Sequence, residues 1–154
     1  FFPYVTRSNT GLRNVLALAA ELDLAELEVT YVTRPYTTRH GAGPLPHELP
    51  EKPYPSIVDA TNIPNDWQGA LRFGWLDLDV LRDSIIQDLA EASQLTMLAL
   101  KPKLALSCLD QIGYEEVTYY VSGRRCQAKA DRFPTIMMNS LQLDEVSVSF
   151  NPNR

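Results

Sequence analysis

The hydrophobic positions of this chain change their spacing several times, from the period of a helix to that of a strand. Between residues 10 and 23 apolar side chains recur every three or four positions, which predicts an amphipathic helix. This apolar stripe consists of Leu12, Val15, Leu16, Ala19 and Leu22. From residue 27 to residue 32 the pattern alternates, which predicts a strand that leads into a glycine-containing loop.

A second helix is predicted to begin after Asp77. An aspartate directly before a helical stripe is a typical N-cap, and Asp79 in the first turn suits the positive end of the helix dipole. The stripe consists of Leu78, Leu81, Ile85, Leu89 and Ala92.

The rest of the chain alternates between short elements. We predict a buried strand at 95–100, a short helix at 104–110, and a last strand at 146–150. Two alternating runs, 117–121 and 125–129, flank a Ser-Gly pair that predicts a hairpin turn. Because helices and strands are mixed throughout, we predict an α/β fold with a mixed sheet flanked by helices.

Proline punctuates one stretch of the chain. Six of the eleven prolines lie between Pro44 and Pro64, and proline interrupts both long helices and central strands. We therefore predict a proline-rich surface loop over residues 44–66. No sharp change of composition marks a domain boundary, so residues 1–154 are predicted to form a single domain.

Composition narrows the classes of function. A chain of 154 residues with 45% hydrophobic and 21% charged residues is typical of globular domains. Its net charge of −5 argues against a nucleic-acid partner, because phosphate backbones attract clustered cations. Its apolar runs are too short to span a membrane, so no membrane partner is expected.

The cysteines and histidines give no metal signature. Cys108 and Cys126 are far apart and show no zinc spacing, so we predict free thiols and a cytoplasmic location. The two histidines, His40 and His47, are too few for a histidine-built metal site, and we predict no metal ligands in this chain.

The segment from Tyr36 to Glu48 is the richest in chemistry. It combines Arg39 with Gly41, Gly43 and two prolines directly after a strand-like run. Glycine permits a close approach of backbone to a ligand, and arginine offers a planar fork for phosphate or carboxylate. The residues alone leave two interpretations open: an anion-binding loop, or a rigid surface loop with an ordinary ion-paired arginine.

This segment resembles the YxTRxGxGPxPxE signature of the adenylosuccinate synthetase family, whose enzymes join aspartate to a purine nucleotide. Three further segments resemble signatures of the family in the same order along the chain. They are residues 3–10 (its PFVTSSNT), residues 74–77 (its GWLD) and residues 149–154 (its S-x-G-P-x-R). The resemblance spans the whole chain but only the C-terminal part of the family's enzyme, so the chain is alternatively that part of one larger domain.

The resemblance implies roles for particular residues. Thr6 would contact the 5′-phosphate of the purine monophosphate, although a helix-capping threonine is the alternative. Arg39, His40, Gly41 and Gly43 would line the monophosphate pocket. His40 replaces a residue that acts through its backbone, and a proton-transfer role for its ring stays open.

The same resemblance implies partners and chemistry beyond these residues. Ser149, Asn151 and Pro152 would border the base of the nucleoside triphosphate. The family's catalytic aspartate and histidine and its Mg²⁺ ligands would lie upstream, which leaves no catalytic residue in this segment. A homodimer is also implied. The chain begins without methionine or a signal-like leader, so we expect sequence upstream of Phe1.

Two departures from the family pattern qualify these roles. The family's aspartate-binding GRxRR loop corresponds here to residues 68–72, where only Arg72 is retained, as a contact for the amino acid or the phosphoryl group. Its guanine-reading TKLD corresponds, without gaps, to residues 101–104, which end in Leu104. Leucine cannot accept the hydrogen bonds that guanine donates, so ATP or dATP is expected rather than GTP.

The resulting hypothesis is a ligase that joins aspartate to a purine monophosphate, either IMP or dGMP, with hydrolysis of a nucleoside triphosphate. The donor change also resembles the compact phage and archaeal branch of the family, and the phage relatives act on dGMP. Two alternatives remain open: a non-catalytic nucleotide-binding or partner-binding module derived from the family, and an unrelated α/β domain.

Overall fold

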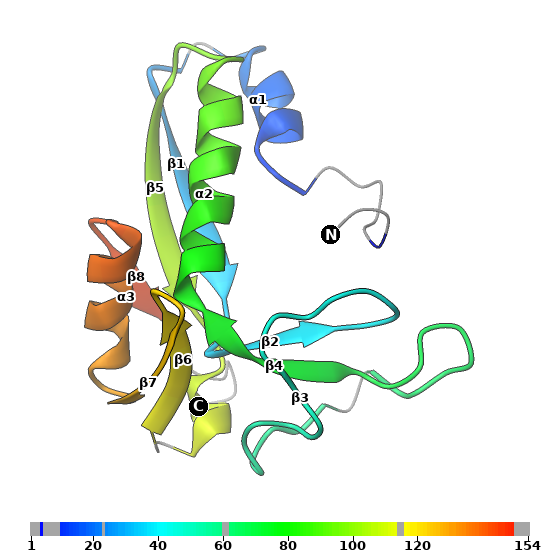
Figure 1. Ribbon diagram of the computed structural model, residues 1–154. Helices are drawn as coiled ribbons and strands as arrows, with labels where there is room; N and C mark the ends of the chain where they lie inside the picture. The colour runs from blue at the N-terminus through cyan, green and yellow to red at the C-terminus, as the bar shows by residue number, and fades with distance from the viewer. Residues whose placement is uncertain (1–3, 5–9, 23, 60–61, 114–115, 150–154) are drawn as a thin grey trace.

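The structure, a computed structural model, describes residue 4 and residues 10–22, 24–59, 62–113 and 116–149. Within these residues the fold is a mixed α/β arrangement of two sheets flanked by three helices, which confirms the predicted fold class (Figure 1). The helices are α1 (Arg13–Ala19), α2 (Leu78–Ser93) and α3 (Phe133–Leu141), with a 3₁₀ helix at Leu109–Ile112.

The first sheet is a parallel sheet of three strands in the order β1-β5-β8. These strands are β1 (Glu26–Thr33), β5 (Ala99–Leu106) and β8 (Val146–Val148). Helix α2 runs along β1 and β5 (Figure 1), and α3 packs against α2 and β8. Leu104, at the centre of β5, is paired with Tyr31 on one side and Val146 on the other.

The second sheet has five strands, which are β2 (Tyr36–Arg39), β3 (Glu48–Leu49), β4 (Arg72–Asp77), β6 (Glu116–Val121) and β7 (Arg124–Lys129). Strand β4 pairs antiparallel with β2 and with β3, and parallel with β6. It then passes directly into α2, because Asp77 is both its last residue and the N-cap of that helix.

One large hydrophobic core lies between the sheets and helices. Its centre contains Leu78 of α2, Leu104 and Leu106 of β5, and Phe133 and Met137 of α3, all with 0% of their surface exposed. A smaller cluster of buried hydrophobic side chains packs α1 against α2 and β1.

A polar contact fixes the same junction between α1, α2 and β1. The Asp88 carboxylate on α2 accepts a hydrogen bond from the Tyr31 hydroxyl at 2.7 Å and another from the Leu12 amide at 3.0 Å. Burial, followed by the hydrogen bond to Asp88, raises the pKa of Tyr31 well above its usual range.

Several sequence predictions are confirmed. Helix α2 begins at Leu78, and the Asp77 side chain accepts hydrogen bonds from the amides of Asp79 and Val80. The hairpin of β6 and β7 turns at Ser122 and Gly123, whose φ angles are both positive, as a two-residue hairpin turn requires. Cys108 and Cys126 are free.

Other predictions are wrong. The helix predicted at 104–110 is instead the end of β5, a residue with positive φ at Cys108, and the 3₁₀ helix. Leu104 and Leu106 alternate with less buried neighbours and bond to strands on both sides, so the strand period prevails. The strand predicted at 95–100 begins only at Ala99, and Met97 is fully exposed.

The described residues of the proline-rich segment, 44–59 and 62–66, include several that pack against the second sheet. Tyr54 and Ile57 are only 5% and 4% exposed and belong to the large core. The Lys52 ammonium donates to the carbonyls of Pro55 and Ile57 at 2.8 and 2.9 Å, which closes a tight local turn. Among the described helices, none is long and apolar enough to cross a membrane.

Candidate functional site

The glycine–proline loop, residues 40–47, connects β2 to β3 and is held by one arginine of β4. The Arg72 Nε and Nη2 donate to the two carboxylate oxygens of Glu48 at 2.7 and 2.6 Å. Its Nη1 donates to the carbonyls of Gly41 and Gly43 at 2.8 and 2.9 Å. The hydrogen bond from Arg72 lowers the pKa of Glu48, so this exposed pair stays ionised at neutral pH.

A second arginine lies on the opposite strand. Arg39 is the Cα partner of Arg72 across β2 and β4, so two cations stand side by side at the start of the loop. The Arg39 Nε donates to the carbonyl of Ala42 at 3.1 Å, and its Nη2 donates to the carbonyl of Tyr4. Arg39 therefore connects the loop to the chain segment that precedes α1.

Two glycines are required for these close approaches. Gly43 has φ of +108°, and a Cβ there would lie 2.5 Å from the Tyr4 Cβ and 2.7 Å from the Arg39 Nη2. Gly74 lies on β4 where the end of the loop crosses it. A Cβ at Gly74 would lie 2.7 Å from the carbonyl oxygen of Pro46, so only glycine permits the crossing.

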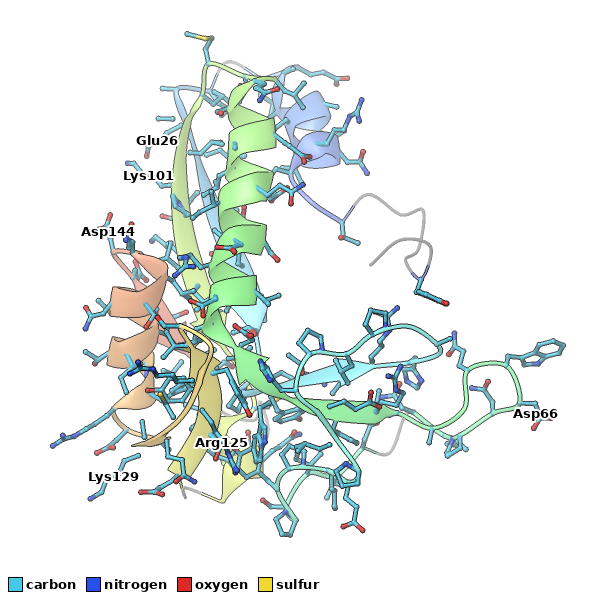
Figure 2. The ribbon with its side chains drawn as sticks, viewed as in Figure 1. Glu26, Asp66, Lys101, Arg125, Lys129 and Asp144 are labelled. Carbon is cyan, nitrogen blue, oxygen red and sulfur yellow. The ribbon has the colours of Figure 1, made fainter. Side chains whose placement is uncertain are left out.

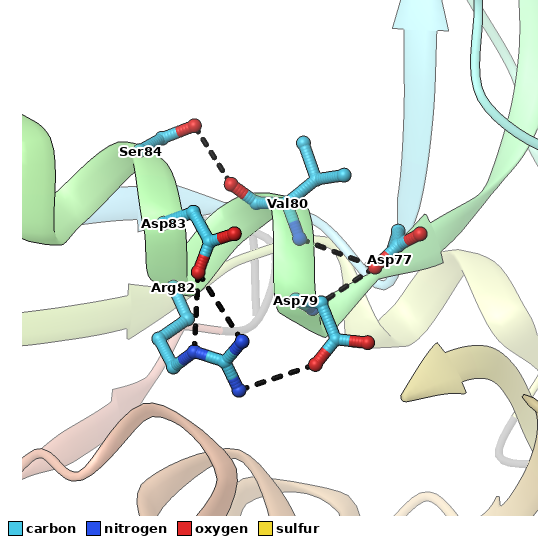
Figure 3. A network of polar contacts seen from close by, with 6 residues as sticks. All are labelled: Asp77, Asp79, Val80, Arg82, Asp83 and Ser84. Atoms are coloured by element: carbon cyan, nitrogen blue, oxygen red, sulfur yellow. Dashed lines mark hydrogen bonds and ion pairs between the residues drawn. The ribbon is translucent and has the colours of Figure 1, made fainter. Parts of the chain in front are cut away.

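The far end of the loop is attached to the start of α2. The His47 Nε2 lies 2.8 Å from Asp77 Oδ2, and the ring stacks on Tyr120 with centroids 3.4 Å apart. The other carboxylate oxygen of Asp77 caps α2, as Figure 3 shows, where Arg82 also bridges Asp79 and Asp83. Asp77 thus fixes the loop and the helix together.

The His40 Nε2 lies 2.7 Å from Asn62 Oδ1. Its buried Nδ1 has no hydrogen-bond partner among the described residues. The ring is therefore held at one nitrogen only, and both the loop-histidine and proton-transfer interpretations stay predictions.

A cavity of about 280 Å³ adjoins the loop. Its walls come from the end of β2, from Pro44 to Pro46 of the loop, and from the first turns of α2. Its polar lining residues include Thr37, Thr38, Ser84, Arg39 and Asp77. Asp77 already occupies the first amides of α2, and the hydroxyls of Thr37 and Ser84 donate to the carbonyls of Trp75 and Val80, so an anion here would depend on Arg39 and Thr38.

A larger cleft of about 800 Å³ lies beyond Trp75, between the proline-rich segment and the outer face of the β6–β7 hairpin. The Arg125 guanidinium covers the Trp75 ring at 5.4 Å from its centroid, and Lys129 follows on the same strand (Figure 2). Glu116 and Asp131 line the same cleft, so its charge is mixed.

The remaining predicted site residues belong to the other sheet or lie outside the described residues. The Ser149 amide donates to the carbonyl of Leu106 at 2.9 Å, which places Ser149 at the carboxyl end of β5. Ser107, which sequence reasoning missed, lies at the same edge, and its hydroxyl donates to the carbonyl of Thr33 at 3.0 Å. Thr6, Asn151 and Pro152 lie outside the described residues.

Leu104 faces away from any ligand, because it is completely buried in the core. The lysines of the same segment lie on the exposed face of the first sheet. Lys101 pairs with Glu26 at 2.5 Å (Figure 2), and Lys103 pairs with Glu28 and Glu145 at 2.8 and 2.9 Å.

Metal ligands are not gathered anywhere in the described part of the chain. No group of three or more histidine, cysteine, aspartate or glutamate side chains there could hold a metal ion. The Mg²⁺ that the resemblance implies, with ligands upstream, stays a prediction.

Comparison of the sequence with known proteins identifies the family of the chain. The sequence model of adenylosuccinate synthetase matches residues 1–149. The chain belongs to the adenylosuccinate synthetase family. The adenylosuccinate synthetases of Francisella tularensis subsp. novicida (strain U112) and subsp. tularensis (strain SCHU S4) are each 35% identical to it over 119 residues.

The aligned region covers 74% of this chain and 27% of each of these Francisella synthetases. The chain therefore spans about a quarter of the length of the curated relatives that it matches. Within it, the family signatures around Gly43 and Gly74 coincide with two positions where a Cβ would collide with neighbouring atoms.

We expect Gly43→Ala to cost more stability than Gly41→Ala in the full-length protein. Both glycines have positive φ, which costs alanine about 1–2 kcal/mol. Only at Gly43 would the new methyl group also collide with Tyr4 and Arg39, which adds about 1–3 kcal/mol. Urea unfolding of both variants measures the difference, and equal losses would contradict the close approach described above.

Asp77→Ala should destabilise the protein by about 1–2 kcal/mol through loss of the N-cap of α2, with a further loss from the His47 contact. Asp79→Ala is the matched control, because it removes a surface pair with Arg82 and an interaction with the helix dipole but leaves the N-cap in place, and each loss is worth less than about 1 kcal/mol. Thermal and urea unfolding compare the two. A larger effect at Asp79 would mean that Asp77 does not anchor the helix.

Proposed function

We propose that this chain is part of a purine-nucleotide ligase that joins aspartate to a purine monophosphate, IMP or dGMP, with hydrolysis of a nucleoside triphosphate. Family membership supports the reaction class. Within the chain, the glycine–proline loop supports a nucleotide site, because two arginines and two obligatory close approaches build it. This arrangement of the loop is the observation that carries the proposal.

The reaction would proceed in two steps. Phosphoryl transfer from the triphosphate to the 6-oxygen of the purine creates a leaving group, and the aspartate amine then displaces it as inorganic phosphate. Such chemistry depends mainly on positioning and on stabilisation of charge. Catalytic groups and Mg²⁺ ligands are proposed to lie upstream, in a cytoplasmic homodimeric enzyme.

The proposed monophosphate site combines Arg39 with the backbone of His40, Gly41 and Gly43. Arg39 lines the cavity beside the loop and also bonds to the Tyr4 carbonyl, two residues before Thr6. In this cavity the Arg39 guanidinium and the Thr38 hydroxyl are the proposed donors to a phosphate. Thr6 is proposed as a further phosphate contact.

The proposed base site for the triphosphate lies at the carboxyl edge of the first sheet. Ser107 and Ser149 lie there at the ends of neighbouring strands, and ligands commonly bind at such an edge. Asn151 and Pro152 would continue the same site. A serine hydroxyl can both donate and accept a hydrogen bond, so a base at this edge need not offer the two N–H donors of guanine. This property supports ATP or dATP as the triphosphate.

The full-length protein tests the proposal directly. IMP or dGMP, each with aspartate and with ATP, dATP or GTP, should give phosphate release together with a succinyl-purine product for at least one combination. A clear preference for GTP would contradict the donor assignment. Binding of a monophosphate without any condensation would favour the non-catalytic module.

One observation favours the second candidate function, a nucleotide-binding module without ligase activity. Positions 69 and 71, where the family's GRxRR loop carries arginines, are here Gly69 and Leu71, and the retained Arg72 bonds within the loop. A site for the aspartate carboxylates is therefore not recognisable in this segment, and a nucleotide-binding module without ligase activity would explain this.

Two aspartate variants test where the base of the triphosphate is recognised: Ser107→Asp at the carboxyl edge of the first sheet, and Leu104→Asp at the position aligned with the family's guanine-reading aspartate. At Ser107 the carboxylate would stand at the strand end and accept from guanine, so use of GTP relative to ATP should rise by about tenfold, or about 1.4 kcal/mol. At Leu104 it would be buried without a partner, and the protein should unfold. Relative kcat/KM values and unfolding curves measure both outcomes. A folded Leu104→Asp variant that prefers GTP would contradict this assignment.

A further inference from the structure

Arg72 was expected from the sequence to contact the amino acid or the transferring phosphoryl group. Its guanidinium, however, directs four hydrogen bonds into the protein, at 2.6 to 2.9 Å. We propose that Arg72, oriented by Glu48, is a positioning residue that fixes the glycine–proline loop in the form that binds the purine monophosphate. This inference rests on the proposed function of that loop.

The nitrogens of Arg72 donate to two different sets of partners, Glu48 and the loop carbonyls. The Nε and Nη2 edge forms a fork on both oxygens of Glu48, which is the geometry that arginine would otherwise use to bind a dicarboxylate. The Nη1 donates to two carbonyls of the loop. Four of the five N–H donors of arginine are thereby directed to residues of this chain.

The contacts also define the shape of the loop. Gly41 and Gly43 lie two residues apart and both have positive φ, so their backbone has access to conformations that other residues avoid. Both carbonyls are turned toward the same Nη1, which selects one of these conformations. Glu48 lies on β3, opposite Gly74 of β4, so its bond to Arg72 fixes the exit of the loop as well.

Global stability is a weak explanation for this arrangement. Both side chains of the pair are partly exposed, 27% for Arg72 and 40% for Glu48, and exposed ion pairs contribute little to global stability. Lysine would keep the charge, but its single ammonium cannot reproduce a fork on a carboxylate together with two carbonyl bonds. The predicted effect is therefore on the geometry of the loop more than on unfolding.

The test uses the full-length protein with Arg72→Lys, Glu48→Gln and the double variant. Arg82→Gln is the control, because Arg82 forms a comparable exposed pair on α2 away from the loop. Calorimetry gives the Kd of the purine monophosphate, and steady-state assays give separate KM values for the monophosphate, aspartate and triphosphate.

We expect each single variant to weaken monophosphate binding by about tenfold, equivalent to about 1.4 kcal/mol. The KM for aspartate should stay within about twofold of the wild type, as should all values for Arg82→Gln. The double variant should lose little more than either single variant, because both remove the same interaction. A rise in the aspartate KM with unchanged monophosphate binding would overturn the proposal and make Arg72 a substrate contact.

Amide hydrogen exchange of the loop tests the positioning role of Arg72 independently of whether the protein binds a purine monophosphate. In the unliganded protein, amides of the loop should exchange about tenfold faster in Arg72→Lys and Glu48→Gln, and at the wild-type rate in Arg82→Gln. If the wild type binds no purine monophosphate, the proposed function fails, and unchanged exchange would separately overturn the positioning role.

Discussion

The continuous passage of β4 into α2 is the constraint on which the rest of the structure depends. Strand β4 is hydrogen-bonded to β2, β3 and β6, and α2 contributes Leu78 and Ile85 to the large core. No linker separates them, so the orientation of the second sheet is fixed by the packing of the helix. The cap at Asp77 holds this junction, and its bond to His47 extends it to the glycine–proline loop.

The glycine–proline loop carries a local concentration of positive charge on a chain that is acidic overall. The net charge is −5, yet Arg39 and Arg72 lie opposite one another on adjacent strands. Such a pair would repel if it were left alone, but each guanidinium is bonded to carbonyl oxygens, and Glu48 balances one of the charges. In the proposed monophosphate site, positioned donors rather than an extended basic surface would recognise a small anionic ligand.

The two proposed nucleotide sites lie on different sheets. The loop belongs to the five-stranded sheet, whereas Ser107 and Ser149 lie at the carboxyl edge of the parallel one. A ligase that moves a phosphoryl group between two nucleotides needs both sites in fixed relation. The core that joins β5 to α2, and the continuation of α2 from β4, give this segment a rigid connection between them.

The sequence by itself determined the elements whose signals are local. The stripe of α2, the cap at Asp77 and the Ser122-Gly123 hairpin turn follow from side-chain period and turn chemistry within a few residues. Strand β4 and helix α3 were not predicted, although Phe133, Met137 and Leu141 of α3 recur at helical spacing, and the apolar run through Leu104 was assigned to a helix instead of β5. Only pairing with β1 and β8 decides that strand. The role of Arg72 also depends on tertiary structure, because its partner Glu48 lies 24 residues away and meets it only where β3 crosses β4.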